Sequence, residues 1–254
     1  MQETRLPHRF VPSPNIEPRK NGLTPSILLL HYTGMSSAEK ACDWLCTAES
    51  KVSCHYLIDE RGHITQMVDE SLRAWHAGEG TWRGVADVNS MSIGIEIQNT
   101  GHTAAYEDFP KAQMHAVIAL SRDIVERHDI RPECVLAHSD IAPVRKADPG
   151  EKFDWPLLHR EGVGHWVKPV QISGGQSLQL GDTGDKVMAL QGMFSLYGYG
   201  LDANGIYDRQ TQCVVTAFQR HFRPARVDGV ADRSTIETLF DLTAALPTGR
   251  LGTV

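Results

Sequence analysis

The chain has 254 residues and a mass of 28.1 kDa, enough for one large domain or for a medium domain with a small companion. Hydrophobic residues make up 41% of it, so it can bury a core, and intrinsic disorder is excluded as its main state. Its net charge of −6 lacks the overall positive balance that favours nucleic acid or anionic lipid as a partner. The longest apolar run, residues 27–30, is far shorter than the roughly 20 residues that span a bilayer, and no leader pattern opens the sequence. We therefore expect no transmembrane segment and no nucleic-acid partner.

The cysteines give no disulfide framework. Their number is odd, no two are spaced as C-x-x-C, and Cys42 and Cys46 lie four residues apart in an expected helix, where disulfide geometry is poor. A reducing compartment is the simplest setting for them. The five are Cys42, Cys46, Cys54, Cys134 and Cys213.

The chain begins with a proline-rich segment, and regular patterns follow it. Residues 1–25 contain five of the 13 prolines and are expected to form an irregular arm. The apolar run at 26–31 predicts a strand that is buried on both faces. Ser36 and Ser37 then precede a pattern with apolar residues on one face, which predicts a capped helix.

Strands and helices continue to alternate over the next hundred residues. Residues 55–59 and 63–68 predict a β-hairpin, and the strict alternation of isoleucine with polar residues or glycine at 91–99 predicts a half-buried strand. A long amphipathic helix is expected from Pro110, and residues 135–138 predict another short strand. This interleaving predicts an α/β fold.

The last third of the chain has a different composition. Residues 169–176 are rich in Gly, Ser and Gln and are expected to form a linker. The segment N-G-I-Y-D-R-Q-T at 204–211 returns as D-G-V-A-D-R-S-T at 228–235. Each copy combines a turn signal with an aspartate, Asp208 or Asp232, that can cap the helix after it. With the helix expected before them, these segments predict a three-helix unit of about 70 residues, near the lower limit for an autonomous domain.

Three residues that are far apart in the sequence form a candidate metal site. His31 ends the buried strand, His138 ends a later strand, and Asp148 follows ten residues after His138. Two imidazoles and a carboxylate can supply three ligands to Zn²⁺ and leave a fourth position for water, which the ion makes more acidic. The alternative is that these are hydrogen-bonded core or surface histidines, because twelve histidines form many pairs by chance.

Two charged residues are candidates for catalysis at such a site. Glu96 lies on the face of its strand opposite the isoleucines, where a carboxylate can take a proton from water and pass it to a leaving amine. Lys146 lies in a loop two residues before Asp148, where a cation can stabilise an oxyanion. An ordinary polar strand residue and a solvated lysine are the alternatives.

Trp75 and His76 are candidates for substrate binding. An aromatic ring beside an imidazole can form a wall for a sugar or a peptide, although a tryptophan in a core needs no such role. Cys54, Cys42 and Cys46 are given no nucleophilic role, because a buried cysteine usually acts as a small hydrophobe.

Four ordered segments resemble one enzyme family. They are S-I-L-L-L-H-Y-T at 26–33, W-H-A-G at 75–78, S-I-G-I-E-I-Q-N at 92–99 and A-H-S-D-I-A-P-V-R-K-A-D-P-G at 137–150. Together they resemble the zinc-dependent N-acetylmuramoyl-L-alanine amidases of the AmiD/AmpD type, over roughly residues 20–168. The resemblance implies a central mixed β-sheet flanked by helices, like that of the peptidoglycan recognition proteins, with zinc in a cleft on one side.

The resemblance also implies roles for individual residues. His31, His138 and Asp148 match the metal ligands, Glu96 the catalytic acid and base, and Lys146 the cation at the transition state. Some relatives have cysteine at the position of Asp148, and some have a tyrosine at the position of Cys54, just before a histidine. Because this chain lacks that tyrosine, the acid–base role falls on Glu96.

The C-terminal unit resembles the three-helix peptidoglycan-binding domain found beside many wall hydrolases. The segment L-Q-L-G-D-T-G-D-K-V-M-A-L-Q at 178–191 and the repeated turns carry this resemblance, over about residues 176–245. We therefore predict a zinc amidase catalytic domain at 1–170 and a peptidoglycan-binding domain at 176–245, acting on peptidoglycan or muropeptides. A helical cap that only stabilises the first domain is the alternative for the second.

Three rival functions stay open at this point: a non-catalytic peptidoglycan receptor, a zinc peptidase or deacetylase that cuts another bond of the wall, and a structural metal protein with a closed four-ligand site. The oligomeric state stays open as well. For localisation, a wall substrate indicates the periplasm or cell envelope, whereas the unpaired cysteines and the lack of a leader pattern indicate the cytoplasm.

Overall fold

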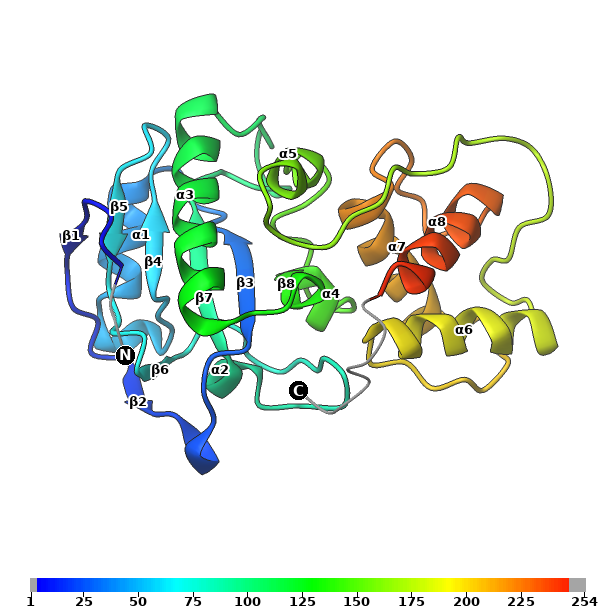
Figure 1. The fold of residues 1–254 in the computed structure, drawn as a ribbon, viewed down its shortest axis with the longest axis horizontal. Helices are drawn as coiled ribbons and strands as arrows, with labels where there is room; N and C mark the ends of the chain where they lie inside the picture. Colours follow the sequence, from blue (N-terminus) through cyan, green and yellow to red (C-terminus); the bar gives the residue numbers. More distant parts are fainter. Residues whose placement is uncertain (1–3, 247–254) are drawn as a thin grey trace.

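The computed structural model describes residues 4–246, which form two lobes that pack side by side (Figure 1). The sheet lobe, residues 4–168, contains all the strands and the helices α1 to α5, and the helical lobe, residues 178–246, contains α6 to α8. The segment between them is mostly exposed and has no helix or strand, as the linker prediction requires. The predicted mixed sheet flanked by helices, with a small helical unit after it, is confirmed.

The main sheet has six strands in the order β1-β5-β4-β7-β3-β8. Strands β4, β7, β3 and β8 are parallel to one another, whereas β4 and β5 form the predicted antiparallel hairpin. A separate antiparallel pair is formed by β2 and β6. The strands are β1 (Arg9–Phe10), β2 (Ile16–Pro18), β3 (Ile27–Tyr32), β4 (Tyr56–Ile58), β5 (Ile64–Gln66), β6 (Leu72–Ala74), β7 (Ser92–Ile97) and β8 (Val135–Ala137).

Helices cover both faces of this sheet. In Figure 1, α3 crosses in front of the sheet and α1 lies behind it. The alternation along β4 matches this arrangement, because Leu57 packs with Ala41 and Leu45 of α1, while its neighbours Tyr56 and Ile58 belong to the core cluster that includes α3. The helices of this lobe are α1 (Ala38–Leu45), α2 (Val88–Met91), α3 (Lys111–His128), α4 (His138–Ile141) and α5 (Trp155–Arg160), with 3-10 turns at Lys20–Gly22, Ala48–Ser50 and Pro132–Cys134.

The N-terminal arm and β7 differ from the sequence-based expectation. The arm is not wholly irregular, because β1 extends the edge of the main sheet and β2 pairs with β6. Strand β7 is buried along most of both faces rather than half-buried, because the His76 ring packs over Gly94 and bonds Ser92 on the polar face, where only Glu96 is half-buried. Alternation marks two chemically different faces, and it does not prove that one of them faces water.

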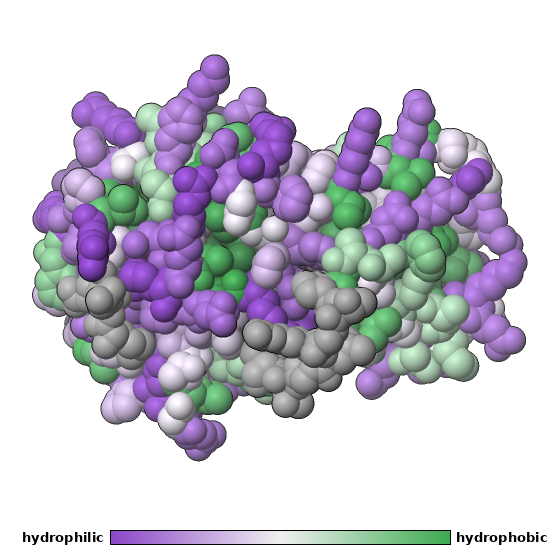
Figure 2. Space-filling view, viewed as in Figure 1, coloured by the Kyte–Doolittle hydropathy of each residue, from purple (hydrophilic) through white to green (hydrophobic). Residues whose placement is uncertain are grey.

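The helical lobe consists of α6 (Asp185–Tyr197), α7 (Arg209–Phe222) and α8 (Arg233–Ala244). Asp208 and Asp232 cap α7 and α8 as predicted, since their carboxylates accept hydrogen bonds from the backbone amides of Thr211 and Thr235, each at 2.8 Å. Hydrophobic residues show on the surface over α6 (Figure 2), and Leu196 of this helix is 54% exposed.

No helix within residues 4–246 combines the length and the apolar character that crossing a membrane requires. The five cysteines are all free thiols, in agreement with the absence of a disulfide framework.

Candidate active site

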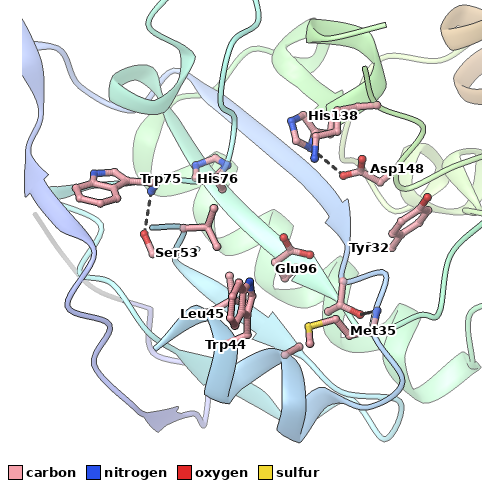
Figure 3. Close-up of a pocket in the computed structure, with 14 residues that line it drawn as sticks. Tyr32, Met35, Trp44, Leu45, Ser53, Trp75, His76, Glu96, His138 and Asp148 are labelled. Carbon is pink, nitrogen blue, oxygen red and sulfur yellow. Dashed lines mark hydrogen bonds and ion pairs between the residues drawn. The ribbon is translucent and has the colours of Figure 1, made fainter. Parts of the chain in front are cut away.

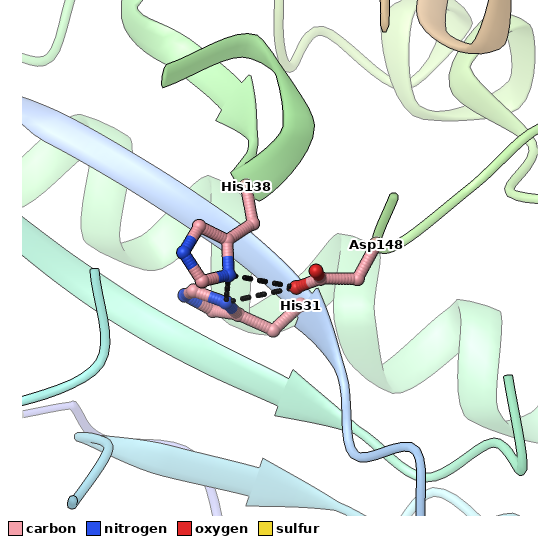
Figure 4. A group of neighbouring side chains, drawn as sticks. All are labelled: His31, His138 and Asp148. Atoms are coloured by element: carbon pink, nitrogen blue, oxygen red, sulfur yellow. Dashed lines mark hydrogen bonds and ion pairs between the residues drawn. The ribbon is translucent and has the colours of Figure 1, made fainter. Parts of the chain in front are cut away.

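The three predicted metal ligands meet at the carboxyl end of the parallel strands (Figure 4). His31 lies near the end of β3, His138 is the first residue of α4 directly after β8, and Asp148 follows in the next loop. His31 Nδ1 is 2.9 Å from His138 Nδ1, and Asp148 Oδ2 lies 3.1 Å and 3.0 Å from these two atoms. All three side chains are buried.

Each imidazole also makes a hydrogen bond through its Nε2 atom, on the side away from Asp148. The hydroxyl of Ser92 donates to the carbonyl oxygen of Val88 at 2.6 Å, so its oxygen accepts from His76 Nε2 at 3.2 Å. His76 Nδ1 is then an acceptor, and His31 Nε2 donates to it at 3.0 Å. His138 Nε2 likewise donates to the carbonyl oxygen of Ala77 at 2.9 Å.

With Nε2 of each ring engaged on the far side, both Nδ1 atoms turn towards Asp148, and a metal ion fits the resulting group. Burial, and next to it His138, lowers the pKa of His31 to about 4, so this ring is neutral near pH 7. In the neutral form in which imidazole binds metals, the Nδ1 lone pairs of His31 and His138 would point at the Asp148 carboxylate, and a cation among the three atoms would be stabilised by all of them. Among residues 4–246, no fourth His, Cys, Asp or Glu joins the group, which is the pattern of an open site rather than a closed structural one.

Glu96 is held beside this group by strand pairing. In the parallel register of β3 and β7, Glu96 is the partner of His31. Glu96 is half-buried, and its Oε2 is a buried atom with no hydrogen-bond partner in the described part of the chain. Burial, and after it the charge of Asp148, raises the pKa of Glu96 well above its usual range. A carboxyl of this kind can exchange a proton with a reacting group.

Lys146 and its neighbour Arg145 occupy the loop between the second and third ligands. Lys146 is half-buried and lines the same cavity as Glu96, His138 and Asp148. Arg145 points elsewhere, since its guanidinium donates to the carbonyl oxygen of Ala77 at 2.7 Å, the same atom that accepts from His138.

A cavity of about 280 Å³ opens beside the metal-ligand group (Figure 3). Glu96 lies at the centre of the lining side chains, with His138 and Asp148 on one side and Trp44 and Met35 on the other. One end of the cavity is thus charged and the other apolar. The lining residues are Tyr32, Thr33, Met35, Ala41, Trp44, Leu45, Val52, Ser53, Trp75, His76, Glu96, His138, Lys146 and Asp148.

The two predicted substrate-binding residues occupy different positions in this cavity. Trp75 lies at its edge, with its backbone amide bonded to Ser53 (Figure 3). His76 is only 9% exposed, and both of its ring nitrogens are already hydrogen-bonded, one to His31 and one to Ser92.

Sequence reasoning missed Ser92 and the role of Gly94, although a signal for both was present. Ser92, Gly94 and Glu96 alternate along β7 and therefore lie on one face. A Cβ atom at Gly94 would come within 2.5 Å of His76 Nδ1, so this glycine leaves room for the ring that bonds His31. Trp44 and Met35 were missed as well, because nothing local distinguishes a tryptophan that lines a cavity from one on an ordinary helix surface.

Comparisons with known proteins agree with this geometry. Residues 21–151 match the family model described as N-acetylmuramoyl-L-alanine amidase. Residues 183–239 match the model of a peptidoglycan binding domain.

Two curated relatives come from Escherichia coli. The N-acetylmuramoyl-L-alanine amidase AmiD is 36% identical over 222 residues, which cover 82% of this chain and 79% of AmiD. The 1,6-anhydro-N-acetylmuramyl-L-alanine amidase AmpD is 35% identical over 164 residues, which cover 58% of this chain and 87% of AmpD.

Two solved structures have the same fold over most of the chain. The complex of E. coli AmiD with the substrate anhydro-N-acetylmuramic acid-L-Ala-D-gamma-Glu-L-Lys aligns with a TM-score of 0.75 and 34% identity, covering 88% of this chain and 91% of that one. AmpDh3 from Pseudomonas aeruginosa in complex with anhydromuramic pentapeptide aligns with a TM-score of 0.73 and 30% identity, covering 88% and 92%. Zinc dependence is general in this family. The chain belongs to the N-acetylmuramoyl-L-alanine amidase family.

Proposed function

We propose that this chain hydrolyses the amide bond between the lactyl group of N-acetylmuramic acid, or of its 1,6-anhydro form, and L-alanine in peptidoglycan or muropeptides. The observation that carries the proposal is the group of three buried residues that could hold a metal ion, His31, His138 and Asp148, beside the carboxyl of Glu96. The E. coli AmiD and AmpD relatives, named for this amidase activity, support it.

His31, His138 and Asp148 would hold Zn²⁺ in the proposed reaction. An ion held there supplies Lewis acidity, which makes a water molecule more acidic and polarises the scissile carbonyl. The protein supplies the orientation, because His76 and the carbonyl oxygen of Ala77 fix the two imidazole rings from behind. We assign His76 this orienting role in addition to its place on the cavity wall.

Glu96 is the proposed acid and base. It takes a proton from the attacking water and delivers it to the amine of L-alanine as the amide bond breaks. Its position on the cavity wall, and the lack of a hydrogen-bond partner for its Oε2 among the described residues, leave the carboxyl available for both transfers. Lys146, at the cavity wall, stabilises the negative charge that develops on the carbonyl oxygen.

The apolar end of the cavity is the proposed place for the rest of the substrate. Trp75 and Trp44 offer aromatic faces, which suit the apolar side of a sugar ring or a short peptide. We further propose that residues 1–170 form the catalytic domain, of which residues 1–3 lie outside the described part, and that residues 176–245 form a peptidoglycan-binding domain.

Product analysis tests the proposed function. Purified sacculi and anhydro-muropeptide are incubated with the full chain, with and without a chelator, and the products are identified by mass spectrometry. Free stem peptide that begins with L-alanine, lost on chelation, is the expected result. Products cut at a different bond would favour the zinc peptidase or deacetylase instead, and no product at all would favour the receptor.

A further inference from the structure

A second buried carboxylate lies two residues after His138, and both lobes contribute donors to it. Asp140 accepts hydrogen bonds from the backbone amide of Ala137 at 2.8 Å, from the phenol of Tyr199 at 2.7 Å and from His221 Nδ1 at 2.7 Å. Ala137 belongs to the sheet lobe, whereas Tyr199 and His221 belong to the helical lobe. The Asp140 side chain is completely buried, so these donors satisfy a charge that water does not reach.

Asp140 fixes a turn that matters to two of the metal ligands. The turn carries His138, and its backbone is hydrogen-bonded to Asp148. Asp140 lies on α4, whose first residue is His138, and its bond to the amide of Ala137 holds the backbone just before that histidine. Between them, the amide of Ser139 donates to the backbone carbonyl of Asp148 at 3.1 Å. A shift of Asp140 would therefore move His138 and Asp148 together.

The two donors from the helical lobe are themselves held in place. The ring of Tyr199 contacts Trp82 of the sheet lobe edge-on, with centroids 5.1 Å apart. Burial and the nearby Asp140 raise the pKa of Tyr199 well above its usual range, so its phenol keeps the proton it donates. His221 is stacked on Trp155 with centroids 3.6 Å apart.

Close backbone approach shows that the lobes are fitted to one another at this junction. A Cβ atom at Gly198 would come within 2.6 Å of the Trp82 ring, and one at Gly200 would come within 2.1 Å of the Thr81 side chain. The amide of Arg83 also donates to the carbonyl oxygen of Gly198 at 2.8 Å. Such contacts fix the distance between the lobes more tightly than a flexible tether would.

We propose that the helical lobe is a positioning part of the metal centre: Tyr199 and His221 hold Asp140, and Asp140 holds the turn that orients His138 and Asp148. This inference rests on the proposed zinc site. It adds a role to the helical lobe that does not depend on whether that lobe binds peptidoglycan. Tyr199, His221 and Asp140 are positioning residues, since none of them belongs to the metal-ligand group.

The test compares two variants of the full chain that each lose one buried phenol hydroxyl. Tyr199→Phe removes the donor to Asp140. Tyr207→Phe is the matched control, because Tyr207 is equally buried in the helical lobe and donates to the carbonyl oxygen of Gly229 at 2.9 Å instead. We expect Tyr199→Phe to weaken zinc binding about tenfold, the lower end of the effect of residues that orient metal ligands, and Tyr207→Phe to leave it unchanged. Zinc affinity is measured by competition with a chromophoric chelator.

A second pair of variants separates positioning from general stability. His221→Leu removes the other donor, whereas His221→Asn keeps an N–H group near the position of Nδ1. With Co²⁺ in place of zinc, the visible absorption spectrum should change in His221→Leu and return towards the wild-type spectrum in His221→Asn. A role limited to stability would instead lower the melting temperature of both metal-free variants and leave the spectrum of the folded protein unaltered.

The outcomes distinguish this inference from the proposed function. If the wild-type chain and the Tyr199→Phe variant bind zinc equally tightly, the positioning role is refuted while the amidase site stands. If Tyr207→Phe weakens zinc binding as much as Tyr199→Phe, the effect is one of stability and the positioning role is refuted as well. If the wild-type chain binds no zinc, the proposed function is refuted, and this inference, which rests on the zinc site, is refuted as well.

Discussion

The metal-ligand group has a counterpart elsewhere in the sheet lobe, built from similar residues but with a different balance of donors and acceptors. The carboxylate of Glu70 is buried, and it accepts hydrogen bonds from the Tyr56 phenol at 2.6 Å, from the Arg127 guanidinium at 2.5 and 2.8 Å and from His128 Nε2 at 2.6 Å. The carboxylate thus accepts from three different side chains. In the group of His31, His138 and Asp148, by contrast, the partners of the carboxylate are two imidazoles, and the three possible metal-ligand atoms lie within 4.8 Å of one another.

This difference indicates a structural role for the Glu70 group and a metal-binding role for the group of His31, His138 and Asp148. A buried carboxylate surrounded by N–H and O–H donors has its charge neutralised by the protein and contributes to stability. Two imidazoles and a carboxylate that converge on one point are instead typical metal ligands, and a bound cation would neutralise the carboxylate. Glu96 is a third case, because its buried carboxyl oxygen Oε2 has neither donor nor acceptor within the described residues, which suits a group that moves protons.

Glu96→Gln should impair catalysis and leave the fold stable, whereas Glu70→Gln should do the reverse. The larger effect is expected at Glu96. Glu96→Gln removes the proposed acid and base while it keeps the shape of the side chain. We expect turnover of muropeptide to fall about 10²–10⁴-fold, with zinc affinity and melting temperature close to those of the wild type. Steady-state kinetics with the metal-loaded protein measure this. A variant that releases peptide at the wild-type rate would refute the role of Glu96.

Glu70→Gln should destabilise the fold and leave catalysis by the folded protein unchanged. Without the carboxylate, the guanidinium of Arg127 loses its ion pair with Glu70, while its ion pair with Asp123 stays. Breaking a buried ion pair in this way typically costs about 3 kcal/mol or more. Urea unfolding should show that loss, while the kcat of the folded variant stays at the wild-type value. An unchanged free energy of unfolding would show that the Glu70 group is not the structural one.

The pH dependence of the free energy of unfolding gives a second test of the structural role of Glu70. Burial acts to raise the pKa of Glu70, but hydrogen bonds from Arg127, His128 and Tyr56 outweigh it and lower the pKa from 4.5 to about 2. A lowered pKa stabilises the folded chain above about pH 4.5, and this contribution, about 3 kcal/mol, is lost as the pH falls towards 2. The stability difference between the wild type and Glu70→Gln should therefore narrow between pH 6 and pH 3 in urea titrations. A stability difference that stays constant from pH 6 to pH 3 would contradict the lowered pKa of Glu70.

A smaller effect is expected at Ser92, behind the metal-ligand group. Ser92→Ala removes the oxygen that accepts from His76 Nε2, so the bond that orients His31 is no longer fixed. We expect zinc affinity to fall about tenfold. Ser121→Ala is the matched control, because Ser121 is also buried and its hydroxyl has no hydrogen-bond partner in residues 4–246. Equal zinc affinities in the two variants would exclude the orienting chain through His76.

Much of the fold and of the metal-ligand group could be predicted from the sequence because the signals are local. A buried apolar run that ends in His31, the alternation that sets Glu96 opposite three isoleucines, and the aspartates that cap α7 and α8 each lie within a short window. Parallel strands bring their carboxyl ends to one edge, so residues at those ends were expected to meet.

The remaining features depend on pairings between distant segments. The bonds of His76 to His31 and Ser92, and the donors that Asp140 receives from Tyr199 and His221, require the strand register and the placement of the helical lobe. No local pattern encodes either. The same holds for the arm, whose strands β1 and β2 form only because partners elsewhere in the chain offer free edges.

Direct zinc titration of the metal-stripped chain tests the central claim, that His31, His138 and Asp148 together bind one divalent ion. Calorimetry on the full wild-type chain should give one zinc ion per chain, and Asp148→Ala should bind far more weakly while Glu70→Gln, once folded, binds as the wild type does. A wild-type chain that takes up no zinc, or an Asp148→Ala variant that binds it equally well, would contradict the account.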